Sequence, residues 1–272
     1  MRIMEFLHRP LAAAGHDVEF LCSEDVAKGS RGRTSHLVFP WVVRERAARA
    51  AARGAPYDIV NVHEAQSALV ATVRGGTGDP AVVVTTHGVE QRAWELALQE
   101  RRLGREGPGL GSRVWHPLSS LWQSRVGLTH ADAVFCLSSE DRDYLVRTIG
   151  VESERIVRIF PGAEPVFGAA AAHRSYTSAA HLVFAGAWRK NKGVEDLVPA
   201  FVQLARRHAR LRLTVLGAGV ADAVVRGALP ADLQSRVTTV ATATDEETAR
   251  VLADCDLFVL PSLFEEIGRA HV

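Results

Sequence analysis

The chain has 272 residues, of which 47% are hydrophobic, enough to build one large or two modest domains with buried cores. Lys and Arg number 32 against 31 Asp and Glu, so the formal net charge is +1. This balance excludes the broad basic surface typical of nucleic-acid-binding proteins, and we expect no nucleic-acid partner.

The three cysteines, Cys22, Cys136 and Cys255, lie far apart in apolar segments. Their spacing matches neither a disulfide framework nor a zinc site, so we expect buried, reduced thiols and no metal. No apolar run reaches the roughly 20 residues of a membrane span, and no secretory signal precedes the first charged residues. We therefore expect a cytoplasmic protein, while the composition leaves peripheral contact with a membrane open.

The first residues show a helical pattern followed by a strand. Ile3, Leu7 and Leu11 have helical spacing, Gly15 ends the pattern, and Val18–Cys22 is typical of a strand. A doubly wound α/β domain normally begins with a strand. We therefore expect that the first strand of this domain is missing from the chain.

Short apolar runs then alternate with helical patterns up to residue 160. Further strands are predicted at Ile59–His63, Ala81–Thr86, Ala133–Leu137 and Ile156–Phe160. Helices are predicted at Val43–Arg53, Gln91–Arg105 and Glu140–Ile149, the last beginning with a capping motif at Ser138. This alternation predicts βαβ units and a parallel sheet.

Residues 161–180 break the alternation with prolines, a glycine and a run of alanines, which predicts an interdomain linker. Strands are then predicted at Leu182–Ala185, Leu211–Leu216, Val237–Val240 and Leu257–Leu260, with helices at Glu195–Arg207 and Glu246–Ala253. We predict a first domain at residues 1–160 and a second, incomplete α/β domain at residues 181–265. Residues 266–272 match the translation of a common sequencing-library adapter, and we interpret them as an artefact.

Two strand ends of the second domain carry polar side chains of opposite charge. Leu182–Ala185 runs into Gly186 and the cations Arg189, Lys190 and Lys192, whereas Leu257–Leu260 runs into Pro261, Ser262 and then Glu265. Ligands of open parallel sheets bind outside the carboxyl ends of the strands. Cations at one end and a carboxylate at the other suit a ligand with phosphate and hydroxyl groups, such as a nucleotide-sugar.

Two other motifs lack a required residue. His63-Glu64 begins like the helix of a zinc protease, but the second histidine is absent. Gly217-Ala218-Gly219 follows a strand but lacks the third glycine of a dinucleotide-binding motif, so it predicts a turn from strand to helix.

Taken in their order and spacing, several segments resemble the family-four retaining glycosyltransferases, whose GT-B fold has two Rossmann-like domains facing a cleft. The matching segments are Gly15–Val18, Tyr57–His63, Thr86–Gly88, Ala131–Val134, Ile159–Glu164, Gly186 with Lys192–Gly193, Leu216–Gly219, and Asp256–Ser262 with Glu265. The resemblance spans most of the chain. It implies transfer of a sugar, of hexosyl type, from a nucleotide-diphosphate-sugar to an acceptor with retention of configuration. It also implies acceptor binding on the first domain, donor binding on the second, no tightly bound cofactor and no metal.

The resemblance assigns three residues to the reaction. Lys192 corresponds to the cation that holds the donor diphosphate, which gains charge as the glycosidic bond breaks. Glu265 corresponds to the first carboxylate of a paired-glutamate motif that contacts sugar hydroxyls. His87 corresponds to a histidine near the transferred sugar.

Gly186, Arg189 and Gly162 are expected to join Lys192 and Glu265 in binding the donor. The family pattern has an arginine directly after the loop glycine, where this chain has Ala187. Arg189 or Lys190 would then supply the missing charge.

Glycans, lipid carriers and small molecules all remain open as acceptors. A nucleotide-sugar epimerase on the same fold is one alternative, although we find no carboxylate pair and histidine set for it. A nucleotide-sugar-binding module without turnover is another, and the alanine at position 187 favours it. We expect the 272-residue chain alone to be inactive, because the second glutamate of the paired motif would follow its last trusted residue, Glu265.

Overall fold

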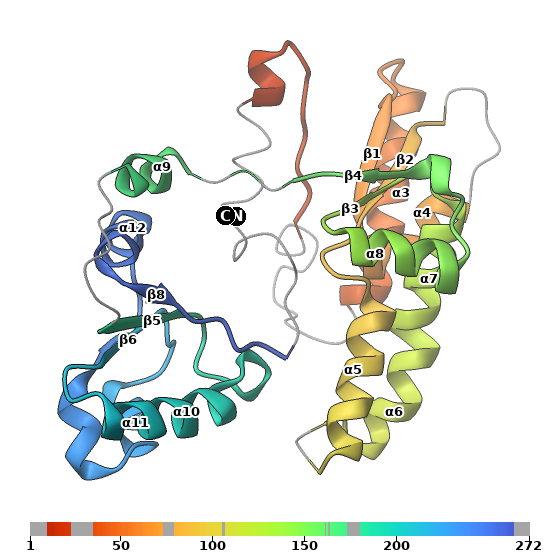
Figure 1. The fold of residues 1–272 in the computed structure, drawn as a ribbon. Helices are drawn as coiled ribbons and strands as arrows, with labels where there is room; N and C mark the ends of the chain where they lie inside the picture. The colour runs from red at the N-terminus through yellow and green to blue at the C-terminus, as the bar shows by residue number, and fades with distance from the viewer. Residues whose placement is uncertain are drawn as a thin grey trace. The chain divides into compact units, whose positions relative to one another are not determined.

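The computed structural model describes residues 10–22, 35–72, 79–104, 107–160, 162, 164–172 and 180–263. The chain divides into two compact units, Met1–Trp94 with Pro108–Arg158, and Glu95–Gly107 with Ile159–Val272. Each unit is built around its own four-stranded parallel sheet (Figure 1). The mixed α/β class with two parallel sheets is thus confirmed.

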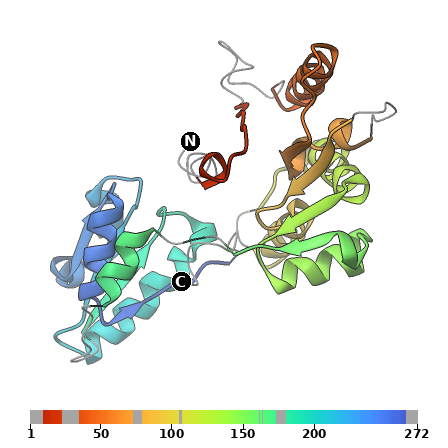
Figure 2. The same cartoon turned by 90° about the horizontal axis from the view of Figure 1, so that it is seen from above.

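The first sheet has the strand order β1-β2-β3-β4. Its strands are β1 (Ile59–His63), β2 (Ala81–Thr85), β3 (Ala133–Cys136) and β4 (Ile156–Arg158). Figure 2 shows these strands side by side, in colours from orange to green. Only the first residue of β2 is exposed, which explains its unbroken apolar sequence, because a central parallel strand is covered on both faces.

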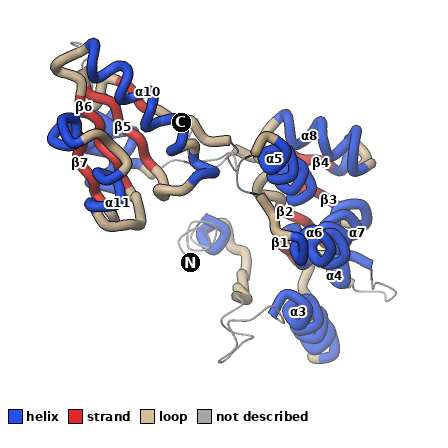
Figure 3. The backbone as a smooth tube through the Cα atoms, turned by 90° about the horizontal axis from the view of Figure 1, so that it is seen from below, coloured by secondary structure: helices blue, strands red, loops and turns tan. Residues whose placement is uncertain are grey.

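The helical segments of this part of the chain are mostly longer than the strands. They are α3 (Ser35–Ala52), η1 (Glu64–Gln66), α4 (Ala68–Thr72), α5 (Glu90–Arg102), α6 (Leu110–His116), η2 (Pro117–Leu121), α7 (Trp122–His130), α8 (Ser139–Tyr144), η3 (Leu145–Ile149) and η4 (Ser153–Arg155). Helix α6, the π-helical turn η2 and α7 form one uninterrupted helical segment. Leu128 from α7 and Leu145 from η3 are fully buried in one core cluster with Val84 and Val134 of the sheet. Figure 3 shows helices α7 and α8 next to the strands of this sheet.

The second sheet has the order β7-β6-β5-β8. Its strands are β5 (His181–Ala185), β6 (Arg212–Leu216), β7 (Val237–Val240) and β8 (Leu257–Phe258). The helical segments are α9 (Pro165–Ala171), η5 (Lys190–Lys192), α10 (Val194–Arg207), α11 (Asp222–Gly227), η6 (Ala231–Arg236) and α12 (Asp245–Asp254).

Alternate residues of β5 point to opposite faces of this sheet, as in any strand. Phe184 belongs to the core cluster that contains Phe201 of α10 and Val225 of α11. Val183 packs instead with Val251 of α12. The second unit therefore has three layers, with α10 and α11 on one face of the sheet and α12 on the other (Figure 1).

An aspartate directly before a strand fixes the register in both sheets. Oδ2 of Asp132, before β3, accepts a hydrogen bond from the Val82 backbone N–H at 2.6 Å. Oδ2 of Asp256, before β8, accepts from the backbone N–H groups of Ala180 and His181, each at 2.8 Å. These carboxylates satisfy the backbone donors at the start of the neighbouring strand, where the ladder has not yet begun.

All predicted strands after residue 58 are present, with shifted ends. The structure also contains, with shifted ends, the helices predicted at residues 43–53, 91–105, 140–149, 195–207 and 246–253. Ser138 is confirmed as a helix cap, because its side chain accepts from the Asp141 backbone N–H at 2.9 Å. Cys136 and Cys255 are buried as predicted, whereas Cys22 is half-buried. The predicted linker contains helix α9. Pro165 is its first residue, where a backbone N–H would have no partner within the helix, so the N–H that proline lacks is not needed.

The predicted strand at Val18–Cys22 is wrong, because these residues have no regular secondary structure. A strand needs a neighbour for its backbone groups, and no described strand pairs with this segment. Its Glu19 side chain instead forms an ion pair with Arg46 of α3 and a hydrogen bond with Tyr57. Before it, residues 10–13 are helical and Gly15 follows with φ +87°, while residues 1–9 of the predicted helix lie outside the described part.

Candidate functional site

The strand order of the second sheet creates a switch point between β5 and β8. After β5 the chain adds β6 and β7 on one side, and then returns to add β8 on the other side. The helical connections therefore diverge at this point, and in open parallel sheets ligands bind outside the carboxyl ends of such strands. The segments that leave these ends are residues 186–193 and 259–263, and the first contains the cations Arg189, Lys190 and Lys192 that were singled out in the sequence.

The two segments touch at Gly193. A Cβ atom on this residue would lie 1.9 Å from the Pro261 carbonyl oxygen, and the backbone has φ +74°. Glycine is required on both counts, since any side chain would collide with the backbone and strain the left-handed conformation. Next to this contact, the Leu263 N–H donates to the Asn191 carbonyl at 3.0 Å.

The loop that follows β5 is held at its beginning as well as at its end. The Gly186 N–H donates to the Leu216 carbonyl and the Trp188 N–H to the Ala218 carbonyl, both at 2.8 Å. Both acceptors lie at the end of β6 or just after it. The first part of the loop is thus tied to the neighbouring strand end, as expected of a turn that places ligand-binding groups.

The cations of this loop differ in their surroundings. Lys190 forms an ion pair with Glu195 of α10, with Nζ 3.0 Å from Oε1. Arg189 is exposed, and Lys192 is half-buried immediately before Gly193. Because the Lys190 charge is already compensated by Glu195, the exposed Arg189 is a better candidate than Lys190 for binding an anion.

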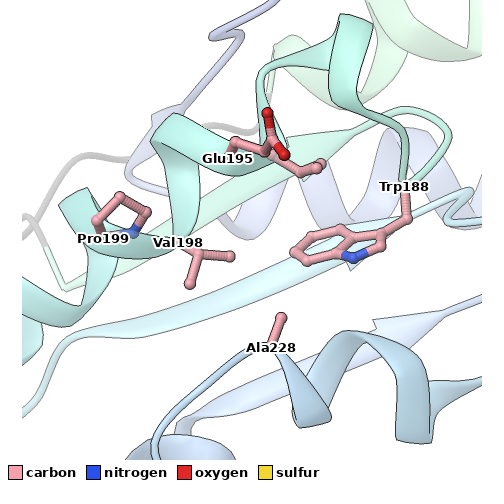
Figure 4. Close-up of a pocket in the computed structure, with 6 residues that line it drawn as sticks. Trp188, Glu195, Val198, Pro199 and Ala228 are labelled. Carbon is pink, nitrogen blue, oxygen red and sulfur yellow. The ribbon is translucent and has the colours of Figure 1, made fainter. Parts of the chain in front are cut away.

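A hollow lies between Trp188 and helix α10, and Figure 4 shows the Trp188 indole facing Val198 and Ala228. Its lining is apolar apart from Glu195, the partner of Lys190. Such a surface offers no donors to a diphosphate, whose recognition needs cations or N–H groups. The hollow is therefore no candidate for the phosphate site.

In the first unit, two histidines meet at the carboxyl ends of β1 and β2. Nδ1 of His63 and Nε2 of His87 are 2.7 Å apart, and the rings are inclined by only 10°. One nitrogen must donate and the other accept, so the pair holds at most one shared proton between these two atoms. Burial, and then the nearby His87, lower the pKa of His63, although its side chain keeps some solvent access.

Glu64, the residue after His63, is a buried carboxylate that holds the surrounding loops. Oε1 accepts from the Ser124 hydroxyl of α7 at 2.5 Å and from the Glu90 N–H at the start of α5 at 2.8 Å. Burial raises the pKa of Glu64, and hydrogen bonds from Ser124, Thr86 and the Glu90 backbone partly offset this effect. The carboxylate thus ties the end of β1 to α5 and α7.

The loop that carries His87 is tightly turned. The Thr86 hydroxyl accepts from the N–H groups of Gly88 at 3.2 Å and Val89 at 2.7 Å. Gly88 has φ +136° and Val89 has φ +40°, which is unusual for a β-branched residue. Strained backbone of this kind is typical of binding and catalytic loops, and here it fixes the position of His87.

The structure places the predicted site residues in two groups. His87 belongs to the first unit, where His63 and Glu64 lie beside it. The sequence analysis did not assign these two residues to the site, and their position at the end of a predicted strand was the only signal for them. Gly186, Arg189 and Lys192 lie together in the loop after β5, whereas Gly162 is exposed between β4 and α9. Glu265 lies outside the described residues.

The described ranges were also informative about metal ligands and membrane spans through what they contain. These ranges contain no group of three or more His, Cys, Asp or Glu side chains arranged to hold a metal ion. They also contain no helix that combines the length and the hydropathy needed to cross a membrane.

Two protein-family models match the chain. The model described as Glycosyltransferase Family 4 matches residues 2–166, and the model described as Glycosyl transferases group 1 matches residues 179–272. The comparison with curated proteins gave no match.

Solved structures of GT-B glycosyltransferases share the fold. WaaG, a glycosyltransferase involved in lipopolysaccharide biosynthesis, has a TM-score of 0.62 at 16% identity, over 97% of this chain and 72% of that one. The α,α-trehalose 6-phosphate synthase from Burkholderia multivorans has a TM-score of 0.55 at 11% identity, and the match covers 90% of this chain and 60% of the synthase. The catalytic domain of starch synthase IV from Arabidopsis thaliana, bound to ADP and acarbose, has a TM-score of 0.53 at 14% identity. This match covers 88% of this chain and 59% of the starch synthase chain. The chain thus spans about three fifths of the length of the last two.

The two parallel sheets, the switch point between β5 and β8 and these likenesses define a protein of the GT-B glycosyltransferase class. Because the first family model covers more than half of its residues, the chain belongs to glycosyltransferase family 4.

Proposed function

We propose that this protein transfers a hexosyl group from a nucleotide-diphosphate-sugar to an acceptor with retention of the anomeric configuration. The observation that carries the proposal is the switch point of the second sheet, where the loop containing Arg189 and Lys192 meets the segment after β8. The ADP in the related starch synthase IV structure supports a nucleotide donor.

Lys192 would bind the diphosphate and stabilise the negative charge that it gains in the transition state. Arg189 would supply the charge that is missing at Ala187, because Lys190 is paired with Glu195. Gly186 and Gly162 would let the donor approach the backbone closely. Glu265 would accept hydrogen bonds from the sugar hydroxyls, as a carboxylate orients a sugar ring.

His87 would contact the transferred sugar from the first unit, with its ring oriented by His63. No nucleophile is assigned, and the departing phosphate itself would take the proton of the attacking acceptor hydroxyl. The acceptor would be a glycan, a lipid carrier or a small hydroxyl compound. The donor binds as a substrate, so the proposal involves neither a resident cofactor nor a metal.

The test compares Lys192→Ala with Arg207→Ala, which removes a solvent-exposed cation from the far end of α10. Binding of UDP-, GDP- and ADP-sugars to the 272-residue chain is measured by calorimetry. Loss of one charge-assisted contact should weaken binding of the preferred donor by about 10- to 100-fold in Lys192→Ala only. Equal affinities of the two variants would contradict the assignment of Lys192.

Turnover and stereochemistry need a separate measurement. Sugar transfer and donor hydrolysis are followed with the chain and with any longer product of the same gene, and the anomeric configuration of the product is determined by NMR. Retained configuration supports the proposal. Donor binding without transfer or hydrolysis by the longer product would replace it with the binding-module alternative, since the 272-residue chain alone is expected to be inactive.

A further inference from the structure

Three side chains meet where helix α5 lies beside the end of α6 (Figure 1). The rings of Trp94 and His116 are in contact, with centroids 4.5 Å apart and planes inclined by 35°. Nε2 of His116 lies 3.2 Å from Oε1 of Glu90. Glu90 begins α5 and Trp94 follows one turn later, so their side chains share one face of this helix. We call these three residues the Trp94 cluster.

The Trp94 cluster is open to solvent over part of its surface. The side chains of Glu90 and His116 are 37% and 27% exposed, and Trp94 is half-buried. Neither α5 nor α6 contains a buried residue. The hydrophobic core of the first sheet, with the described residues packed against it, does not include Trp94. Core packing therefore does not account for this large aromatic side chain.

The cluster adjoins the loop that carries His87. The Glu90 N–H donates to Oε1 of Glu64 at 2.8 Å, and Glu64 directly follows His63, whose ring contacts His87. Along the chain, only two residues separate His87 from Glu90, and one of them is the strained Val89. One turn of α-helix rises about 5.4 Å, which is close to the length of a pyranose ring. The cluster thus lies where a sugar near His87 would be followed by the next part of a ligand.

The chemistry of the Trp94 cluster fits a saccharide. A pyranose ring has hydroxyl groups around its edge and C–H groups on its faces, so it needs hydrogen-bond acceptors beside a flat apolar surface. The Glu90 carboxylate accepts from hydroxyl groups, and the indole of Trp94 offers the apolar surface. Burial lowers the pKa of His116, so its ring is uncharged at neutral pH. An uncharged imidazole can donate to Glu90 through Nε2 and accept from a ligand hydroxyl at Nδ1.

The other acceptor classes match the cluster less well. The phosphates of a lipid carrier are recognised by cations or N–H groups, and a carboxylate repels them. Arg92, the next cation along α5, is already paired with the buried Asp141 at 2.8 Å. An acyl chain would take the Glu90 carboxylate out of water without offering a hydrogen bond. An ammonium ion would be attracted to Glu90 and Trp94, but by itself it has no hydroxyl group to receive a sugar.

We propose that Glu90, Trp94 and His116 form a subsite for a carbohydrate acceptor, in which the Trp94 ring stacks on a sugar face and Glu90 accepts from sugar hydroxyls. The inference rests on the proposed sugar transfer and narrows its acceptor from three classes to one. His116 holds the other two side chains in place through its ring contact with Trp94 and its hydrogen bond with Glu90.

The first test measures saccharide binding in the absence of any donor. Saturation-transfer NMR and calorimetry follow the binding of methyl glucosides, galactosides and mannosides, and of the corresponding disaccharides, to the 272-residue chain. We expect binding from this panel, and Trp94→Ala should weaken it at least about tenfold because the stacking surface is lost. Trp94→Phe keeps an aromatic face and should weaken binding less than about threefold. Glu90→Gln should weaken it about tenfold, because the hydroxyl groups lose a charged acceptor.

The control is Trp41→Ala, which removes a tryptophan of α3 that is 58% exposed. Its saccharide binding should equal that of the unchanged protein, and circular dichroism checks that all variants are folded. Equal binding by Trp94→Ala and Trp41→Ala would overturn the proposal, as would a panel in which no saccharide binds. Binding of choline instead of the saccharides, lost in Trp94→Ala, would also overturn it, since the cluster would then be a cation site.

A second test separates this inference from the proposed function. Sugar transfer by a longer product of the same gene is measured with the saccharides and with undecaprenyl phosphate as acceptors. Trp94→Ala should raise the KM for the saccharide about tenfold, with a smaller change in kcat. Transfer to undecaprenyl phosphate alone would overturn the subsite and leave the proposed function intact. Saccharide binding that depends on Trp94, without any transfer, would support the subsite and contradict the proposed function.

Discussion

The two sheets place their polar residues by different means. In the second sheet the order β7-β6-β5-β8 itself creates a switch point, and glycine packing brings the two loops together there. In the first sheet the order β1-β2-β3-β4 has no reversal among the described strands, and hydrogen bonds of buried side chains hold the loops instead. Topology thus positions the polar residues of the second unit, and a side-chain network positions those of the first.

The largest effect on stability is expected from adding a side chain at the glycine contact between the two loops of the second sheet. Gly193→Ala places a methyl group against the Pro261 carbonyl and strains a left-handed residue, so it should lower the free energy of unfolding by about 2–5 kcal/mol. Denaturant titration, with hydrogen exchange of β5 and β8, measures the effect.

Gly219→Ala is the matched control, because Gly219 has φ +66° but an added Cβ would meet no atom within 4 Å. It should cost only the conformational strain, about 1–2 kcal/mol. If both variants lose the same stability, close packing at Pro261 is not what joins the two loops.

The corresponding change in the first sheet is Glu64→Ala. It leaves the Ser124 hydroxyl and the Glu90 N–H buried without their acceptor, so we expect a loss of about 2–4 kcal/mol. Glu64→Gln keeps an oxygen at this position and should cost less than about 1 kcal/mol at neutral pH. Thermal denaturation of both variants checks this, and an equally large loss in Glu64→Gln would show that the negative charge matters more than the hydrogen bonds.

Glu64 also predicts a pH dependence. Because burial raises its pKa above the ordinary 4.5, the folded protein binds this proton more tightly than the unfolded chain. The resulting stabilisation is present below pH 4.5 and is lost as the pH rises through the folded pKa. Denaturation over this range should therefore show a smaller fall in stability for Glu64→Gln than for the unchanged protein.

The smallest effect is expected at His63. Burial lowers its pKa, so the stability associated with His63 is lost as the pH falls below 6.5, and solvent around the ring keeps this loss small. In sugar transfer, however, His63→Ala should reduce kcat/KM about tenfold by releasing the His87 ring.

His130→Ala, which removes an exposed histidine from the end of α7, is the control for this variant. An unchanged rate for His63→Ala would mean that His87 needs no positioning, or that it takes no part in the reaction.

The sequence predicted the features that depend on neighbouring residues. Buried parallel strands are unbroken apolar runs, so β2 and β5 were found, and the polar loop after β5 followed from them. The Gly193 contact with Pro261 joins residues 68 positions apart, and Glu64 finds Ser124 60 positions away. Such pairs depend on tertiary packing, and no local pattern reports them. The same holds for strand pairing, because Val18–Cys22 has the pattern of a strand but pairs with none of the described strands.

The loop after β5 has a consequence for how donor preference can change. Its beginning is tied to β6 through Gly186 and Trp188, and its end is packed against Pro261 at Gly193. A segment fixed at both ends can exchange side chains but accepts no insertion or deletion without breaking one attachment. If Arg189 supplies the charge missing at Ala187, as proposed, moving a positive charge between these two positions is a change of the permitted kind. A mutagenesis library for altered donors should accordingly randomise Ala187 and residues 189–192, keep the length, and leave both glycines in place.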